Sequence, residues 1–223
     1  SYSWAREFLD ENRRGKVPKG FMDLLDVGDL VYLSTENDQV KLDQIPQAQS
    51  SLISFNPKTG EVLSYVGGSV FNDSQFDRVR QSYPQSGSVF KPFIYASAFS
   101  GGYNPSSLIN DAPIIFEDEN LETFWRPENY SGKFYGLTTL REALVQSINI
   151  VSIKLLREIG IKKSSETIDN FGFGTERLPQ DLSLALGSGN FSPAEVARGF
   201  SVFANGGMIS DIHYVSQIKD KNG

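Results

Sequence analysis

A serine and a lysine separated by two residues are the strongest candidates for chemistry in this chain. Ser88-Val89-Phe90-Lys91 follows Gly87 at the expected start of a helix that ends at residues 101–102. Residues i and i+3 share one face of a helix, so we expect the Lys91 amine above the Ser88 hydroxyl. Burial disfavours the ammonium and lowers the pKa of a lysine, and a neutral Lys91 can accept the serine proton. The pair predicts a nucleophilic serine with a lysine as its base.

A second motif, Ser147-Ile148-Asn149, falls at the expected break of a helical segment over 139–159. In a serine–lysine site, a hydroxyl and an amide on such a turn relay a proton to the leaving amine and hold a substrate amide. The alternative is two polar residues that hydrogen-bond back to helix carbonyls.

Neither motif is specific by its spacing alone. Ser-x-x-Lys also occurs at 216–219, and Ser-x-Asn also occurs at 54–56 and 188–190. For Ser88 the alternative is an ordinary helix-capping serine beside a solvated lysine. From spacing, both interpretations stay open at each motif.

Composition removes most other kinds of catalytic centre. The 223 residues include no cysteine, which excludes thiolate nucleophiles, disulfides and Cys-ligated metals, and a single histidine, His213, which excludes a multi-His zinc site. The formal net charge of −6 argues against a nucleic-acid partner. No apolar run reaches the roughly 18 residues that a membrane span needs. A start without methionine and a turn-like end predict a fragment of a longer protein.

The elements that must position these residues change in type near residue 46. Residues 1–45 are rich in charge and turn residues around one strand-like run, 30–33, and predict the tail of a small β module. From residue 46 the chain predicts a hairpin over 52–66 with its turn at 56–60.

Helices follow the hairpin. Capping boxes at Thr139-Leu140-Arg141-Glu142 and Ser192-Pro193-Ala194-Glu195 predict two helix starts, and Gly160 and residues 205–207 predict the ends. The run 212–219 alternates like an exposed strand. This order predicts an α+β fold in which helices pack on an antiparallel sheet.

The chain resembles a known family at several places in order. Both motifs match the first two of the three motifs of the serine penicillin-recognising enzymes, S-x-x-K, S-x-N and K-T-G. Further stretches resemble the transpeptidase domain of class A penicillin-binding proteins, and others resemble the linker of the 1a type. The stretches that resemble the transpeptidase domain are residues 86–93, 108–114, 129–130 with 140–144, 184–189 and 197–207. The stretches that resemble the linker are residues 4–6 and 27–29. These ordered matches cover nearly the whole chain and favour the catalytic interpretation of both motifs.

The resemblance implies a role for each motif residue. Ser88 is expected to be the acylated nucleophile, Lys91 its base, Ser147 the proton shuttle, and Asn149 a partner of Lys91 and of the substrate. The implied activity is that of a serine D,D-transpeptidase, which cross-links peptidoglycan stem peptides at their D-alanyl-D-alanine ends and is acylated by β-lactams. No metal or organic cofactor is implied.

The resemblance also implies an architecture. Residues 46–223 are expected to form the N-terminal part of a transpeptidase domain with the fold of penicillin-binding proteins and β-lactamases, and residues 1–45 part of an OB-like linker module. The parent protein is expected in the bacterial cytoplasmic membrane with this region outside it, and with a glycosyltransferase domain upstream.

The third motif is missing from its expected place. No K-T-G or K-S-G follows residue 149, and Lys58-Thr59-Gly60 precedes the serine in a hairpin turn. In the family, the strand that carries this motif supplies the second oxyanion donor and binds the substrate carboxylate. We therefore expect a chain truncated before this motif and weak or inactive by itself.

Two other functions stay open. A β-lactamase or D,D-carboxypeptidase would resolve the acyl-enzyme with water, but Glu166, the candidate to activate that water, lies in an E-x-x-L-N pattern whose leucine is replaced by Asp169. The module over 1–45 also counts against a hydrolase. A non-enzymatic penicillin sensor would be acylated without any transfer.

Overall fold

The chain divides into two units, residues 1–48 and 49–223. The structure, a computed structural model, describes residues 5–7, 9–10, 13–43, 48–117 and 124–221. The predicted boundary between residues 45 and 46 lies outside the described residues, as does Trp4 of the linker-like stretch. Within the described ranges, no helix has the length and apolar character needed to cross a membrane.

The first unit contains a short β hairpin. Strands β1 (Tyr32–Glu36) and β2 (Gln39–Asp43) pair antiparallel, and Asn37 and Asp38 between them have φ values of 50° and 60°. Two successive left-handed residues form the turn whose twist suits a hairpin, and Asn and Asp tolerate that conformation. β1 begins at Tyr32, two residues after the start of the strand predicted over 30–33, and β2 was not predicted.

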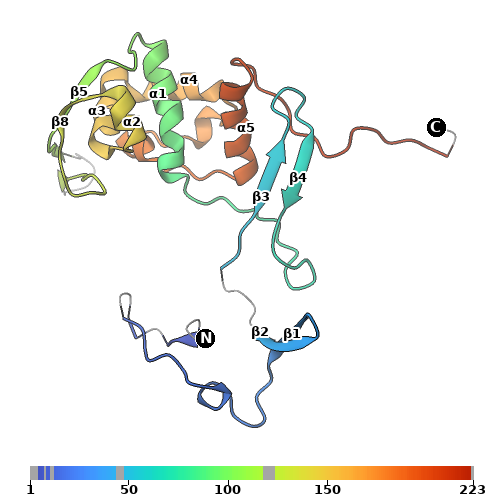
Figure 1. The fold of residues 1–223 in the computed structure, drawn as a ribbon. Helices are drawn as coiled ribbons and strands as arrows, with labels where there is room; N and C mark the ends of the chain where they lie inside the picture. The colour runs from blue at the N-terminus through green and yellow to red at the C-terminus, as the bar shows by residue number, and fades with distance from the viewer. Residues whose placement is uncertain (1–4, 8, 11–12, 44–47, 118–123, 222–223) are drawn as a thin grey trace. The chain divides into compact units, whose positions relative to one another are not determined.

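The strands of the second unit form separate antiparallel pairs (Figure 1). The predicted hairpin is confirmed by β3 (Leu52–Phe55) and β4 (Val62–Val66). Further along the chain, β5 (Leu108–Asp111) pairs with β8 (Gly136–Thr139), and β6 (Phe116–Glu117) pairs with β7 (Phe124–Trp125).

Five α-helices are described in the second unit. They are α1 (Lys91–Ser100), α2 (Leu140–Val145), α3 (Asn149–Ile159), α4 (Ile161–Asp169) and α5 (Pro193–Ala204), with 3₁₀ turns at Gly87–Phe90, Thr175–Arg177 and Leu182–Leu186. The capping box predicted at Ser192 is complete, because Ser192 and Glu195 each accept the other's backbone N–H. At Thr139 the side chain accepts the N–H of Glu142 at 3.2 Å. The predicted helix starts at Thr139 and Ser192 are confirmed.

The core lies around α1 and α3. Val151, Leu155 and Leu156 of α3 are fully buried, and Gly160 ends α3 with φ of 92°. Beside α1, phenylalanine rings pack with centroids 4.8–5.9 Å apart: Phe90, Phe93, Phe171, Phe173, Phe191, Phe200 and Phe203. Helix α5 lies between α1 and the β3–β4 hairpin (Figure 1). This packing fixes the N-terminal end of α1, where Lys91 lies.

The strand predicted over 212–219 is wrong except at one residue. His213 forms an isolated parallel bridge with Glu61, and Tyr214 then meets Tyr65 of β4 edge to face at 5.3 Å. Alternating side chains make a strand only where a neighbouring backbone continues the ladder. In the part of the chain that the structure describes, residues 212–219 find such a neighbour only at His213.

Candidate active site

Ser88 lies on a 3₁₀ turn rather than in the first turn of an α-helix. Helix α1 begins at Lys91, and the preceding turn is closed by the Lys91 N–H, which donates to the Ser88 carbonyl. The reason is Pro92, whose missing N–H cannot make the α-helical bond to that carbonyl. Because residues i and i+3 eclipse in a 3₁₀ turn, Ser88 and Lys91 still leave the turn on the same side. Ser88 is exposed, whereas Lys91 is 1% exposed.

A glycine-rich loop, residues 187–189, hydrogen-bonds to the backbone at the start of this turn. The N–H groups of Ser86 and Gly87 donate to the carbonyls of Gly189 and Gly187 at 3.0 and 2.9 Å. Gly187 has φ of 72°, and a Cβ placed on it would lie 1.9 Å from the Gly87 carbonyl oxygen. Phe191, just beyond the loop, stacks on Phe90 at 5.6 Å. Only glycine at position 187 allows the loop to approach the serine turn this closely.

Lys91 joins the two predicted motifs. Its Nζ donates to the Ser147 carbonyl at 2.6 Å, to Ser147 Oγ at 3.0 Å and to Asn149 Oδ1 at 2.7 Å. Burial lowers the pKa of Lys91 to about 8, because desolvation disfavours the ammonium. All three ammonium hydrogens are therefore directed at the Ser147–Asn149 motif. With this pKa, about one amine in ten is neutral at pH 7, and the fraction rises with pH.

Ser147 lies at the predicted break between two helices, in a conformation that costs energy. It connects α2 to α3 with φ of 54°, an uncommon value for a residue other than glycine. The turn is held by the N–H of Ile148, which donates to the Ala143 carbonyl at 2.8 Å. Of the interpretations left open by the sequence, the back-bonded helix-interior serine is wrong, since Ser147 Oγ contacts Lys91.

Asn149 is the first residue of α3, and it is held by Glu128 and Asn129, which were not among the predicted site residues. Its Nδ2 donates to the Glu128 carbonyl at 2.9 Å, and its backbone N–H donates to Asn129 Oδ1 at 3.0 Å. The residue before it, Ile148, offers no side-chain cap. Because an isoleucine side chain cannot accept a hydrogen bond from a helix N–H, its position before Asn149 already indicates in the sequence that another part of the chain caps α3.

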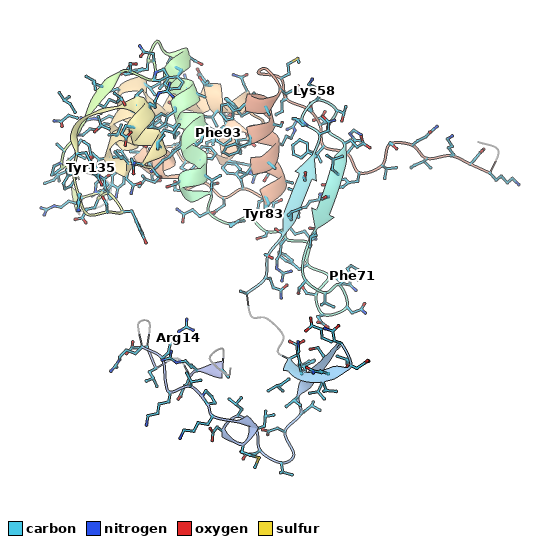
Figure 2. All side chains as sticks on the ribbon, viewed as in Figure 1. Arg14, Lys58, Phe71, Tyr83, Phe93 and Tyr135 are labelled. Atoms are coloured by element: carbon cyan, nitrogen blue, oxygen red, sulfur yellow. The ribbon has the colours of Figure 1, made fainter. Side chains whose placement is uncertain are left out.

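The structure thus brings three of the four predicted residues into direct contact: Lys91, Ser147 and Asn149. The Ser88 hydroxyl makes no hydrogen bond to the residues that the structure describes, and it faces solvent one 3₁₀ turn before Lys91. Lys58-Thr59-Gly60 occupies the turn of the β3–β4 hairpin, at the opposite end from Tyr83 (Figure 2). No group of three or more metal-ligating side chains occurs in the described ranges.

An open groove of about 590 Å³ lies beside Ser147. Strand β8 and helix α2 form it together, and its lining includes residues on both sides of Ser147 in the sequence. The lining residues are Tyr135, Leu137, Thr138, Thr139, Glu142, Gln146 and Ile148. Ser147 itself does not line this groove.

Two family models match the chain. The model described as the penicillin binding protein transpeptidase domain matches residues 51–223, and the one described as the penicillin-binding protein OB-like domain matches residues 1–48. These matches confirm the resemblance, and with it the expected transpeptidase fold preceded by OB-like sequence.

Curated relatives align over almost the entire chain. Penicillin-binding protein 1A of Pseudomonas aeruginosa is 43% identical over 224 residues, which cover 100% of this chain and 27% of that protein. For penicillin-binding protein 1A of Escherichia coli, the identity is 37%, over 99% of this chain and 26% of that protein. The chain spans about a quarter of the length of these relatives.

Solved structures agree with these alignments. Penicillin-binding protein 1A from Haemophilus influenzae superposes with a TM-score of 0.82 at 36% identity, over 86% of this chain and 29% of that one. PonA1 from Mycobacterium tuberculosis, solved in complex with penicillin V, shares the fold, with a TM-score of 0.68 at 20% identity, over 79% of this chain and 50% of that one. The transpeptidase model covers well over half of the residues, and the two 1A relatives align over at least 99% of this chain. The chain therefore belongs to the penicillin-binding protein transpeptidase family.

Proposed function

We propose that this chain carries the acylating half of a serine D,D-transpeptidase site, with Ser88 as nucleophile and Lys91 as its base. The observation that carries the proposal is the position of Lys91 Nζ, buried and directed at Ser147 and Asn149 one turn after an exposed serine. Family membership supports the reaction type, and the buried position of Lys91 next to both motifs supports the proposed roles of the residues.

In the first step, neutral Lys91 takes the Ser88 proton while Ser88 Oγ forms a bond to the penultimate D-alanine carbonyl carbon of a stem peptide. The oxyanion that develops there is stabilised by backbone N–H donors, one of which is proposed to be that of Ser88. The peptide C–N bond then breaks, and the leaving D-alanine amine takes a proton.

Ser147 is proposed to deliver that proton. Once it has taken the Ser88 proton, Lys91 is an ammonium with three hydrogens, and it can pass a proton onward only through a group that both accepts and donates. The carbonyl of Ser147 and Oδ1 of Asn149 can only accept, whereas the Ser147 hydroxyl can also donate. Ser147 Oγ therefore gives its proton to the leaving amine and regains one from Lys91.

In the second step, the amine of a neighbouring stem peptide attacks the Ser88 ester. A C–N bond forms, the bond to Ser88 Oγ breaks, and neutral Lys91 takes the proton that the attacking amine loses and passes it to Ser88 Oγ. A β-lactam forms an analogous Ser88 ester when its ring amide opens, but the amine stays attached to the acyl group and the adduct stalls. No cofactor takes part in this scheme.

The proposed substrate also implies where the protein is located. Stem peptides lie outside the cytoplasmic membrane, so we propose that the protein carrying this chain is anchored there, with residues 49–223 on the outer side. The relatives are about four times as long as this chain, which leaves room for the anchor, the glycosyltransferase domain and the third-motif strand that the family resemblance implies.

A competition between transfer to an amine and hydrolysis tests this function. The intact protein is given a stem peptide ending in D-alanyl-D-alanine together with an amine acceptor, and the products are separated by mass. We expect the cross-linked peptide to exceed the hydrolysed one, and a Ser88→Ala variant to form neither. Predominant hydrolysis with rapid turnover of a chromogenic cephalosporin would instead identify a hydrolase. An acyl-enzyme that forms without either product would identify a sensor.

A further inference from the structure

Helix α3, which begins with Asn149, is capped by a residue 20 positions earlier in the chain. Asn129 Oδ1 accepts the N–H groups of Asn149 and Ile150 at 3.0 and 3.1 Å. These are two of the four N–H groups that a helix cannot satisfy internally. Asn129 thus takes the place of the side-chain cap that Ile148 cannot provide.

The orientation of the Asn129 amide is set by Asp111. Asn129 Nδ2 donates to both carboxylate oxygens of Asp111, at 2.9 and 3.0 Å, and to the Lys133 carbonyl at 2.8 Å. The Tyr135 N–H also donates to Asp111, at 2.9 Å. Because an ionised carboxylate only accepts, it faces the amide nitrogen of Asn129 and turns the amide oxygen toward α3. Asp111 is 1% exposed and Asn129 is 6% exposed, so water offers little competition.

The same segment orients the side chain of Asn149. The Glu128 carbonyl accepts from Asn149 Nδ2, so Oδ1 faces Lys91 Nζ at 2.7 Å. Residues 128 and 129 therefore hold both the backbone and the side chain of the residue that binds Lys91. Asp111 sets the direction of the Asn129 hydrogen bonds to α3, and the Glu128 carbonyl sets the direction of the Asn149 side chain.

We propose that Asp111 and Asn129 are positioning residues that fix the start of α3 and thereby the acceptor geometry around Lys91. This inference rests on the proposed function, because its consequence is measured as Ser88 acylation. Neither residue contacts Lys91, so their effect on the reaction passes through Asn149. A shift of the α3 start by a fraction of an ångström would move Asn149 Oδ1 away from Lys91 while most of the core stays intact.

A reciprocal exchange tests the proposal in the intact protein. Asn129→Asp places two acceptor-only carboxylates face to face and should lower the rate constant of Ser88 acylation by penicillin by at least about tenfold, since small displacements in such sites have large rate effects. Adding Asp111→Asn restores a donor and an acceptor between the two side chains, because Asn at position 111 can donate to Asp at position 129, which still caps α3; the Lys133 carbonyl alone stays without its donor. The double variant should acylate at least about tenfold faster than Asn129→Asp alone, by the same argument.

Asn205→Ala is the matched control. Asn205 is also a buried asparagine near a helix end, and its Nδ2 donates to the Met208 carbonyl at 3.1 Å, beyond α5. This variant should lower the free energy of unfolding but leave the acylation rate of the folded protein within about twofold, because it does not touch the α3 start.

Three results would overturn the positioning role: an Asn129→Asp rate within twofold of wild type, a double variant no faster than the single one, or an equal rate loss in Asn205→Ala. If Asn129→Asp does not fold, the double variant is compared with wild type, and failure of the double variant to fold and acylate would also overturn it. Absence of acylation in the wild type would reject the proposed function itself, which is a different outcome.

Discussion

Burial of Lys91 has the largest consequence of any single side chain in the site. Its pKa is lowered to about 8, and the neutral amine is the form that can take the Ser88 proton. We predict that the acylation rate constant rises about tenfold per pH unit below pH 8 and levels off above it. Stopped-flow labelling between pH 6 and 9.5 measures this profile. A flat profile across that range would remove Lys91 from the role of base.

Replacement of Lys91 separates its chemistry from its packing. Lys91→Met keeps an unbranched apolar stem in the core but has no base, so acylation should fall by about 10²–10⁴ while the far-UV circular dichroism is retained. Lys91→Arg is the control for charge: it restores a hydrogen-bond donor to Ser147 and Asn149 but stays protonated, and it should be equally slow. Undiminished labelling of either folded variant would contradict the assignment.

At the level of turns and helices, the approach of the 187–189 loop to the serine turn is the feature most open to a test. In Gly187→Ala, the new Cβ would meet the Gly87 carbonyl oxygen, and the turn that carries Ser88 must move. We predict a loss of acylation of at least about tenfold in addition to a loss of stability. The measurements are the acylation rate constant and the free energy of unfolding in urea.

Gly206→Ala is the control for the conformational part of that effect. Gly206 has φ of 62°, close to the 72° of Gly187, but a Cβ on it has no neighbour within 4 Å. Both variants bear the left-handed penalty of roughly 1–2 kcal/mol, and only Gly187→Ala displaces the serine turn. Equal acylation losses in the two variants would show that the contact with Gly87 is unimportant.

Local signals predicted the elements that depend on local chemistry. The capping serine at 192, the threonine at 139, the stop at Gly160 and the break at Ser147 were all visible in short stretches of sequence, and each is confirmed. The contacts that orient the site were not visible, because Asn129 reaches α3 across 20 residues and Gly187 meets Gly87 across 100. The strand predicted over 212–219 failed for a related reason, since a ladder depends on a neighbouring backbone as well as on alternation.

At the scale of the whole chain, the prediction concerns the K-T-G or K-S-G motif, which does not occur after Asn149 in these 223 residues. Removal of one oxyanion donor typically costs about 10²–10³ in rate. We predict that this chain alone reacts with fluorescent penicillin at least about a hundredfold more slowly than a longer polypeptide that continues into a K-T-G or K-S-G strand. Comparable rates would mean that the motif is supplied from elsewhere, with Lys58-Thr59-Gly60 as the first residues to replace.

The location of the penicillin adduct is the decisive measurement for the proposed role of Ser88. The intact protein is incubated with benzylpenicillin and digested, and the peptides are sequenced by mass spectrometry. We predict one penicilloyl group on Ser88. The Ser88→Ala variant should carry none, and Lys91→Met should carry far less. An adduct on any other residue, or an unmodified Ser88 in a protein that binds penicillin, would contradict the proposed role.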